Sequence, residues 1–356
     1  MVSSARKTNP KPIVVGLIFG GASGEHAISI RSACTVKQGL SEGLNQDRYQ
    51  IRCFYIDLKG RWWGEEIAEA ALASQQSINP LTLEAGNQRA GFQGFPAGAL
   101  EVDCWFPVLH GPNGEDGTIQ GLFSLMQVPY VGSGVLGSAV GMDKLAMKAA
   151  FAAAKLPQGP YQAVAADELN QQNQLINRLE QKIGYPCFVK PANLGSSVGI
   201  SKARNRDQLW AGLELAASYD KRIVVEKGLT VRELECAVLG REQLRASVVG
   251  EICFDADWYD YETKYVEGHS HPVIPAQVPS HVATQAQKLA IAAAQAVDAC
   301  GLSRVDLFYE EATEQLFINE INTLPGFTHL SMYPMLWAAS GIPLADLVHK
   351  LLELAR

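Results

Sequence analysis

The chain has 356 residues, of which 47% are hydrophobic and 19% are charged, and its formal net charge is −7. At roughly 150 residues per domain, this length predicts two or three domains, and the composition excludes a disordered or fibrous protein. The acidic balance argues against a general nucleic-acid-binding surface.

Residues 1–11 are expected to form a loose polar tail ahead of the apolar run 13–22. Basic residues precede this run, as in a secretory signal peptide. We favour a buried strand over 13–19, because the run is rich in β-branched residues, ends in glycines and meets no cleavage site. No apolar run reaches the ~18–20 residues of a spanning helix. Seven scattered cysteines without a C-x-x-C predict buried, reduced thiols and a cytoplasmic protein.

The rest of the chain alternates helical and strand patterns. The expected elements are, in chain order, a helix over 25–40, strands over 49–57 and 102–109, a helix over 145–155 capped by Asp143, strands over 188–190, 222–226 and 234–239, a helix from a Ser280 cap to Gly301, and a hairpin of strands over 304–310 and 315–322. This alternation predicts an α/β protein with a mainly parallel sheet. Residues 68–98, rich in Gln, Asn and Gly, are expected to be a loop insertion.

One glycine pattern, Gly132 to Gly137, matches the G-x-G-x-x-G of dinucleotide-binding folds. Such folds also need an acidic residue about 20 positions further on. Residues 150–160 contain no Asp or Glu. We therefore expect no dinucleotide site and a structural role for Gly132.

The hairpin predicts a metal site. Side chains two apart on a strand share a face, so Arg304 lies with Asp306, and Glu320 lies with Asn322. If both pairs face the same way, carboxylate and amide oxygens converge, and such ligands suit Mg²⁺ together with substrate phosphates. A solvated sheet face with ordinary charge pairs is the alternative.

Two lysines stand in settings that favour phosphate. Lys144 begins a helix, where backbone N–H groups attract anions, and Lys190 precedes the glycine-serine loop 195–199. Glycine lets a loop backbone approach a phosphate closely. Together with the hairpin, these features predict ATP, whereas each lysine alone could be a surface charge.

Two loops complete the candidate site. Residues 110–117 follow a strand, where α/β sheets bind ligands, and His110 is either a functional or a satisfied structural histidine. Residues 259–275 are long, polar and aromatic, and are expected to form a lid, with an exposed linker as the alternative.

Taken together, these motifs resemble the D-alanine–D-alanine ligases of the ATP-grasp superfamily. In chain order the matching motifs are GGASGEH (20–26), HGPNGEDG (110–117), MDK (142–144), VKP (189–191) with GSSVG (195–199), EK (226–227) with RE (232–233), ETKY (262–265), RVD (304–306) and NEINTLPG (319–326). Eight ordered matches are far more specific than one.

The resemblance implies an α/β (α+β) ATP-grasp fold of three domains, with the nucleotide between the central and C-terminal ones. We expect an N-terminal domain over 1–132, a central domain over 133–226 and a C-terminal domain over 227–356 that carries the lid and the hairpin.

The resemblance also implies residue roles. For ATP they are Lys144, Lys190, Ser196, Ser197 and Val198 at the phosphates, Glu226, Lys227 and Leu229 at the adenine, and Glu233 at the ribose. Two Mg²⁺ or Mn²⁺ ions would be held by Asp306, Glu320 and Asn322. Glu25, with Ser196, Tyr265 and, less directly, His110, would bind the first D-alanine; Lys264, Ser331 and Met332 the second; and Arg304 and Gly326 would stabilise the oxyanion.

The implied function is ATP-dependent ligation of two D-alanines, through a D-alanyl phosphate, for peptidoglycan precursor synthesis in the cytoplasm by a homodimer. Tyr265 resembles the dipeptide-forming members of the family. A relative that uses D-serine or D-lactate as second substrate, and a nucleotide-sensing module without turnover, are the alternatives. We expect no nucleic-acid or membrane partner.

Overall fold

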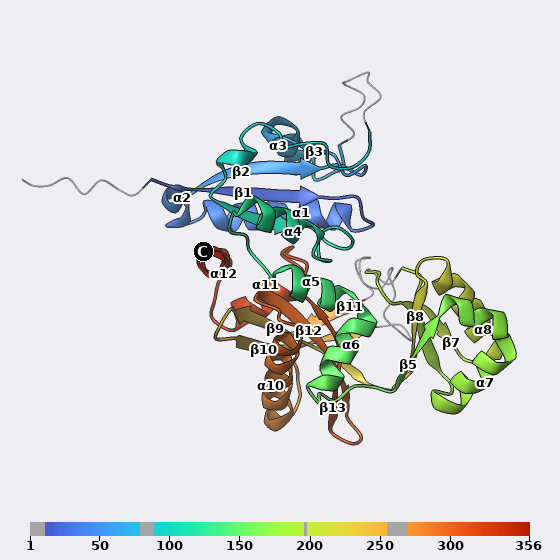
Figure 1. Cartoon of the computed structure of the whole chain (residues 1–356). Helices are drawn as coiled ribbons and strands as arrows, with labels where there is room; N and C mark the ends of the chain where they lie inside the picture. The colour runs from blue at the N-terminus through green and yellow to red at the C-terminus, as the bar shows by residue number, and fades with distance from the viewer. Residues whose placement is uncertain (1–10, 79–88, 196–197, 255–269) are drawn as a thin grey trace, which may run out of the picture.

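The computed structural model describes residues 11–78, 89–195, 198–254 and 270–356. Within these residues the strands form three β-sheets, which lie in separate parts of the molecule (Figure 1). This mixed α/β architecture confirms the predicted fold class. Among the described helices, none is both long and apolar enough to cross a membrane.

The first sheet has the order β3-β2-β1-β4 and lies in the upper part of Figure 1. Its strands are β1 (Ile13–Gly20), β2 (Tyr49–Ile56), β3 (Trp62–Trp63) and β4 (Cys104–Val108), and its helices are α1 (His26–Ser41), α2 (Asn45–Arg48), α3 (Glu65–Ser74) and α4 (Thr118–Met126), with a 3₁₀ turn, η2, at Ala99–Glu101. β1 is parallel to both β2 and β4. The apolar run 13–19 is thus a central buried strand, as predicted. The predicted insertion 68–98 is wrong in its first part, because residues 68–74 belong to α3.

The second sheet, order β5-β8-β6-β7, is antiparallel throughout. It comprises β5 (Tyr161–Ala165), β6 (Cys187–Pro191), β7 (Ser201–Ala203) and β8 (Arg222–Lys227), with the 3₁₀ turn η3 (Ala166–Gln171) and helices α7 (Gln172–Lys182) and α8 (Arg206–Ala217). The expectation of a mainly parallel sheet therefore holds only for the first sheet.

The third sheet, order β11-β10-β9-β12-β13, is also antiparallel. Its strands are β9 (Arg232–Gly240), β10 (Arg245–Phe254), β11 (Ser270–Val273), β12 (Gly301–Glu310) and β13 (Gln315–Asn322), and its helices are α5 (Val135–Met142), α6 (Lys144–Ala153), α10 (Ser280–Ala296), α11 (Met332–Ala339) and α12 (Leu344–Ala355). The hairpin prediction is confirmed. Part of the predicted lid, residues 270–273, is instead strand β11.

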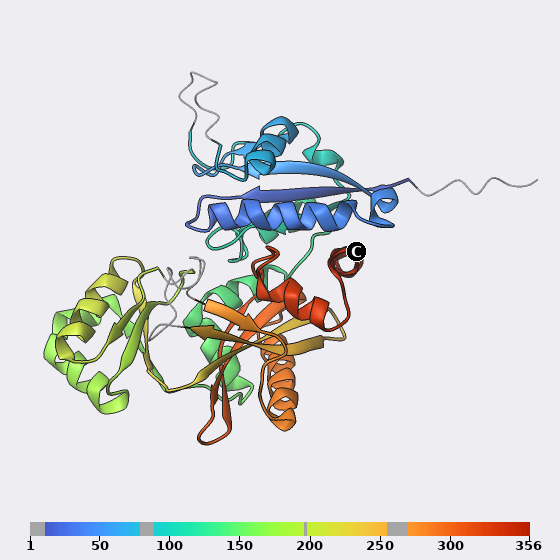
Figure 2. The same cartoon turned by 180° about the vertical axis from the view of Figure 1, so that it is seen from behind.

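Helices join the three sheets into one molecule. Met147 and Phe151 of α6 lie in the hydrophobic core of the third sheet, next to α10. Helix α12 packs on α1 (Figure 2). Gly39 of α1 makes room for Leu344, and Asn45 of α2 donates to the carbonyl of Ala345 at 2.8 Å. The predicted domain limits at 132 and 226 stay predictions.

The helix ends predicted from capping residues were only partly correct. Asp143 caps α6 as predicted, because its side chain accepts from the N–H of Ala146 at 2.9 Å. Ser280 is the first residue of α10 and not its cap, and the helix ends at Ala296, before Gly301 begins β12. All seven cysteines are free thiols, and four of them are buried.

The glycine pattern at 132–137 serves close packing. A Cβ on Gly137 would lie 2.4 Å from the carbonyl oxygen of Asp298, and Gly132 has a φ of +109°. Gly132 also lies against Gly301, where an added Cβ would meet its Cα at 3.0 Å. These contacts supply a structural reason for the pattern.

Candidate active site

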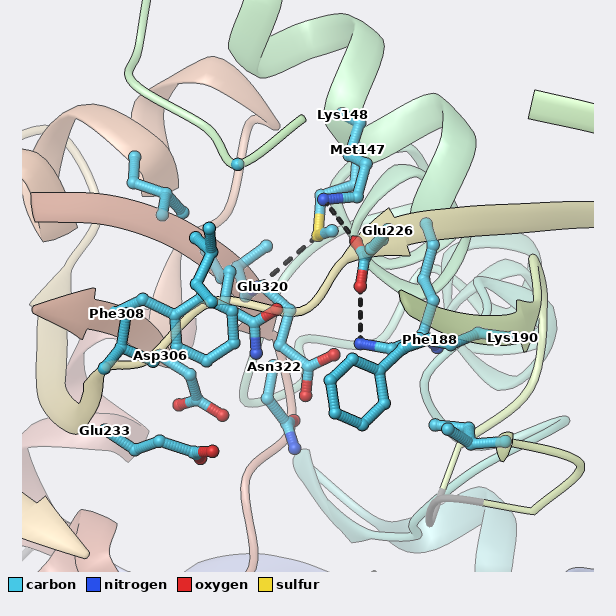
Figure 3. A pocket seen from close by; sticks show the side chains of 18 of the residues that line it. Met147, Lys148, Phe188, Lys190, Glu226, Glu233, Asp306, Phe308, Glu320 and Asn322 are labelled. Carbon is cyan, nitrogen blue, oxygen red and sulfur yellow. Dashed lines mark hydrogen bonds and ion pairs between the residues drawn. The ribbon is translucent and has the colours of Figure 1, made fainter. Parts of the chain in front are cut away.

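A cavity of about 670 Å³ lies between the second and third sheets, and it extends to the start of α1 (Figure 3). Most of the predicted site residues that the structure describes line it. These are Glu25, Lys144, Lys190, Glu226, Lys227, Leu229, Glu233, Asp306, Glu320 and Asn322. The tertiary fold therefore brings together positions that are far apart in the sequence.

The metal-site prediction rests on the register of the hairpin. Arg304 pairs with Asn322, and Asp306 pairs with Glu320, ahead of a β-bulge. Directly opposite residues share a face, so both pairs project from the same face of the hairpin. Figure 3 shows the carboxylates of Asp306 and Glu320 beside the Asn322 side chain.

The donor set fits a hard cation that shares its ligands with phosphate. Within the described residues, no three His, Cys, Asp or Glu side chains are grouped to hold a metal on their own. Two carboxylates and one amide oxygen still suit Mg²⁺, which keeps waters and takes phosphate oxygens as further ligands. The metal role of Asp306, Glu320 and Asn322 stays a prediction.

Arg304 is held by two carboxylates. Its Nε lies 2.6 Å from Asp306 Oδ1 and 2.9 Å from Glu235 Oε2, and its Nη2 lies 2.7 Å from Asp306 Oδ2. The side chain is 9% exposed, so these contacts compensate a buried charge. Arg304 is not among the described residues that line the cavity.

A buried cation cluster faces the hairpin across the cavity (Figure 3). Lys190 Nζ lies 2.6 Å from one oxygen of Glu226, and Lys148 Nζ lies 2.6 Å from the other. Burial by itself raises the pKa of the Glu226 carboxyl, but the two lysines outweigh it and hold that pKa well below its ordinary value. The sequence reasoning missed Lys148, which lies one helical turn after Lys144 on α6.

The predicted phosphate lysines differ in their surroundings. Lys144 Nζ donates to the carbonyl of Leu194 at 2.7 Å, and burial lowers its pKa although Glu320 opposes the shift. Burial also disfavours the charged form of Lys190, but Glu226 and Glu320 raise its pKa overall. Both lysines line the cavity, together with Leu194 and Gly195.

Apolar side chains form the part of the cavity that sequence reasoning missed. Met147, Phe188, Phe308 and Ile318 line it. Phe188 is two residues from Lys190, and Phe308 is two residues from Asp306, so the strand period of two could have indicated them. A flat aromatic base is the kind of group that such a slot accepts.

Glu25 lies where the first sheet meets the cavity. It is the N-cap residue of α1, at the ends of parallel strands β1 and β4, where α/β sheets bind ligands. Added Cβ atoms on Gly111 and Gly195 would lie 3.0 and 3.3 Å from its Oε2. Two backbones thus approach this carboxylate closely because neither residue has a side chain.

Four further predicted residues lie around the segment after β13: His110, Gly326, Ser331 and Met332. His110 is buried and contacts the carbonyl of Leu324 at 3.0 Å. Ser331 accepts from the N–H of Thr328 at 3.0 Å, close to Gly326, and Met332 begins α11. Of the other five predicted residues, the structure describes only Val198. Ser196, Ser197, Lys264 and Tyr265 lie outside the described residues.

Two family models match the chain. They are described as D-ala D-ala ligase N-terminus, over residues 14–133, and D-ala D-ala ligase C-terminus, over residues 150–353. The chain is 68% identical to the D-alanine–D-alanine ligase of Synechococcus sp. (strain RCC307), covering 96% of this chain and 98% of that protein. It is 59% identical to the D-alanine–D-alanine ligase of Prochlorococcus marinus (strain MIT 9313), with 96% and 98% covered.

Two solved structures share the whole architecture. The D-alanine–D-alanine ligase of Coxiella burnetii matches with a TM-score of 0.79 and 33% identity, over 97% of this chain and 94% of that one. The VanG D-Ala:D-Ser ligase of Enterococcus faecalis matches with a TM-score of 0.80 and 30% identity, over 97% of this chain and 100% of that one.

Proposed function

The chain belongs to the D-alanine–D-alanine ligase family of ATP-grasp enzymes, and from this premise we propose which of its residues carry out each step. The protein ligates two D-alanines with ATP as a substrate. One observation carries the assignment of roles: the acidic hairpin and the lysine cluster face each other across one cavity that Glu25 also lines.

The cavity offers one place for each part of ATP. Phe188 and Phe308 would pack against the faces of the adenine. Glu226 and the backbones of Lys227 and Leu229 would form hydrogen bonds with its edge. Glu233 would take the ribose hydroxyls. Lys144 and Lys190 would contact the phosphates, under the loop that carries Ser196, Ser197 and Val198.

Asp306, Glu320 and Asn322 would hold two Mg²⁺ or Mn²⁺ ions, which supply positive charge beside the nucleotide phosphates. The side chains themselves are on a paired strand hairpin, and rigid elements of this kind hold ligand atoms accurately. Arg304 fixes the Asp306 carboxylate by its bidentate contact.

In the first step, Glu25 would bind the ammonium of the first D-alanine, supported by Ser196 and Tyr265, with His110 nearby. The D-alanine carboxylate attacks the γ-phosphorus of ATP, and the bond to the β-γ bridging oxygen breaks. The products are D-alanyl phosphate and ADP. Lys144 and Lys190 stabilise the negative charge of the transferring phosphoryl group.

In the second step, the amine of the second D-alanine attacks the acyl carbon, loses a proton and expels inorganic phosphate. Lys264, Ser331 and the backbone of Met332 would bind the carboxylate of this D-alanine. The N–H of Gly326 and the guanidinium of Arg304 would stabilise the oxyanion. The part of the predicted lid before β11, residues 259–269, would exclude water, because an acyl phosphate hydrolyses readily.

A coupled ADP-release assay with each D- and L-amino acid, with and without Mg²⁺, tests these roles when products are identified by mass spectrometry. We expect Mg²⁺-dependent ADP release with D-alanine, and D-alanyl-D-alanine as the main product. Because a D-Ala:D-Ser ligase is structurally similar, D-serine and D-lactate are included as competitors. A dominant D-alanyl-D-serine or ester product would overturn the choice of second substrate.

We also propose that the enzyme acts in the cytoplasm, in peptidoglycan precursor synthesis, and as a homodimer. Its free, largely buried thiols are consistent with a reducing compartment. Light scattering coupled to size-exclusion chromatography measures the oligomeric state, and a monomer at micromolar concentration would contradict the dimer.

A further inference from the structure

A buried polar junction joins helix α1 to the segment that follows β13. The N–H of Phe327 donates to Ser32 Oγ at 3.1 Å, and the same hydroxyl lies 3.3 Å from His110 Nε2. His110 Nδ1 lies 3.0 Å from the carbonyl oxygen of Leu324. Ser32 is 0% exposed and His110 is 4% exposed, so water does not compete for these bonds.

The partners fix the direction of each bond. A carbonyl oxygen only accepts, so Nδ1 of His110 carries a proton and donates to Leu324. In a neutral imidazole Nε2 is then an acceptor, and the Ser32 hydroxyl donates to it. The Ser32 oxygen keeps a lone pair for the N–H of Phe327. Every polar group of the junction is thus used in one consistent arrangement.

These bonds hold both ends of a short backbone stretch. The carbonyl of Leu324 is held by His110 and the N–H of Phe327 by Ser32, and Gly326 lies between them. The N–H of Leu324 donates to Asn322 Oδ1 at 3.1 Å, which links the stretch to the hairpin. The direction in which the Gly326 N–H points is therefore set jointly by α1, the segment after β4 and the end of β13.

Attachment of the stretch does not depend on Ser32. The Phe327 ring packs against Phe106 of β4 and Tyr333 of α11, at centroid distances of 6.3 and 5.6 Å. Phe327 is also buried in the core of the first sheet. Loss of the Ser32 hydroxyl should therefore leave residues 324–327 in place but free to rotate their peptide groups.

We propose that Ser32 is a positioning residue which, with His110, aims the Gly326 N–H at the oxyanion of the second step. This inference rests on the proposed role of Gly326. An oxyanion donor acts only if it is oriented before the reaction, and a misaimed donor slows the step that develops the charge. The first step, phosphoryl transfer from ATP, uses other residues and should be little affected.

The test compares Ser32→Ala and Ser32→Cys with wild type. We expect kcat for dipeptide formation to fall about tenfold or more, which is less than the ~100- to 1,000-fold cost of losing one such donor outright, with the KM for ATP changed less than about twofold. Because acyl phosphate still forms, ADP release should exceed dipeptide formation, whereas wild type should give one ADP per dipeptide. The isosteric Cys variant, whose sulfur accepts hydrogen bonds weakly, covers the case in which the Ala variant folds poorly.

Two controls use the same helix. Thr35→Val removes a buried hydroxyl that donates to the carbonyl of Arg31 in its own helix, and it should keep wild-type coupling. Ser29→Ala removes bonds to Gly20 and Val108 on the first-substrate side, so it should raise the KM for D-alanine without uncoupling. Full coupling and wild-type kcat in both Ser32 variants would overturn the proposal. A wild-type enzyme that made no dipeptide would instead overturn the proposed function.

Discussion

Lys148 and Glu226 form a buried ion pair, with 2.6 Å between Nζ and Oε1. Glu226 uses its other oxygen to hold Lys190, which we place at the nucleotide phosphates. Lys148 is 3% exposed, and its ammonium also lies over the ring of Tyr161, at 5.1 Å from the centroid. Lys148 is thus a fixed counter-ion for Glu226. Because Lys148 compensates the charge of Glu226, Lys190 can leave Glu226 and bind a phosphate instead.

Replacing Lys148 by Met should weaken ATP binding. Glu226 would then have Lys190 as its remaining lysine partner and would hold it away from the phosphates. We expect the KM for ATP to rise about tenfold, equivalent to about 1.4 kcal/mol, with a smaller change in kcat, measured by steady-state kinetics at saturating D-alanine.

Lys155→Met is the matched control, because Lys155 is exposed just beyond the end of α6. In the double variant Lys148→Met, Glu226→Gln, the loss of ATP affinity should be smaller than the sum of the two single losses, since the second change removes the carboxylate that retains Lys190. An unchanged KM in the single variant, or strictly additive effects in the double one, would contradict this account.

Glu226 should make stability depend on acid pH. Its folded-state pKa lies below the ordinary value of 4.5, because Lys148 and Lys190 outweigh the effect of burial. The unfolded chain therefore takes up the proton first, so the contribution of Glu226 is complete above the unfolded value and is lost as pH falls below it. Glu226→Gln should cost about 3–5 kcal/mol at pH 7, since two buried lysines lose their counter-charge.

Urea unfolding of wild type and Glu226→Gln between pH 3.5 and pH 7 measures this dependence. The difference in unfolding free energy should shrink as the pH falls through about 4.5. A difference that is constant over this range would show that Glu226 titrates at its ordinary pKa in the folded protein.

Glu320→Gln should lower turnover by about 100-fold or more while leaving the fold intact. The side chain lies on a paired strand, opposite Asp306, so an isosteric amide changes charge without changing the hairpin. Activity as a function of Mg²⁺ and Mn²⁺ concentration measures the effect. Glu310→Gln, at the far end of β12, is the control, and equal activity of the two variants would remove Glu320 from metal binding.

Gly132→Ala should lower the melting temperature, because φ is +109° at this position and a side chain there is strained by about 1–2 kcal/mol. Gly121→Ala, in α4 with no atom near the added Cβ, should keep or slightly raise it. We expect no NAD binding in wild type or variant by calorimetry. Measurable NAD affinity that Gly132→Ala abolishes would restore the dinucleotide interpretation.

Parts of the site could be predicted because they depend on local geometry. The alternation of side chains along a strand is enough to place Asp306 on the same face as Arg304, and Glu320 on the same face as Asn322; the observed register then sets the two pairs opposite each other. The helix start at Asp143 is equally local, since its side chain caps its own helix. The Ser280 cap failed, because serine is also accommodated inside the first turn.

Other parts could not be predicted from pattern. In the sequence, Lys148 cannot be distinguished from a lysine on the exposed face of a helix. Its partner Glu226 is on β8, and only the tertiary structure places β8 beside it. Ser32 is one polar residue on a buried helix face, and its partner Phe327 lies 295 positions away in the sequence. Such pairings depend on how three sheets pack, which hydrophobic periodicity does not encode.

The sequence by itself determined the chemistry of this protein: oxygen ligands on a hairpin, lysines beside a glycine loop and an acidic helix start, in an order that matches one ligase family. Only the tertiary structure determines which charged side chains form ion pairs with each other. Burial makes an isolated charge costly, so a buried cation or carboxylate is stabilised by an opposite charge that packing brings to it. That choice made Lys148 the partner of Glu226 and bound Arg304 between Glu235 and Asp306.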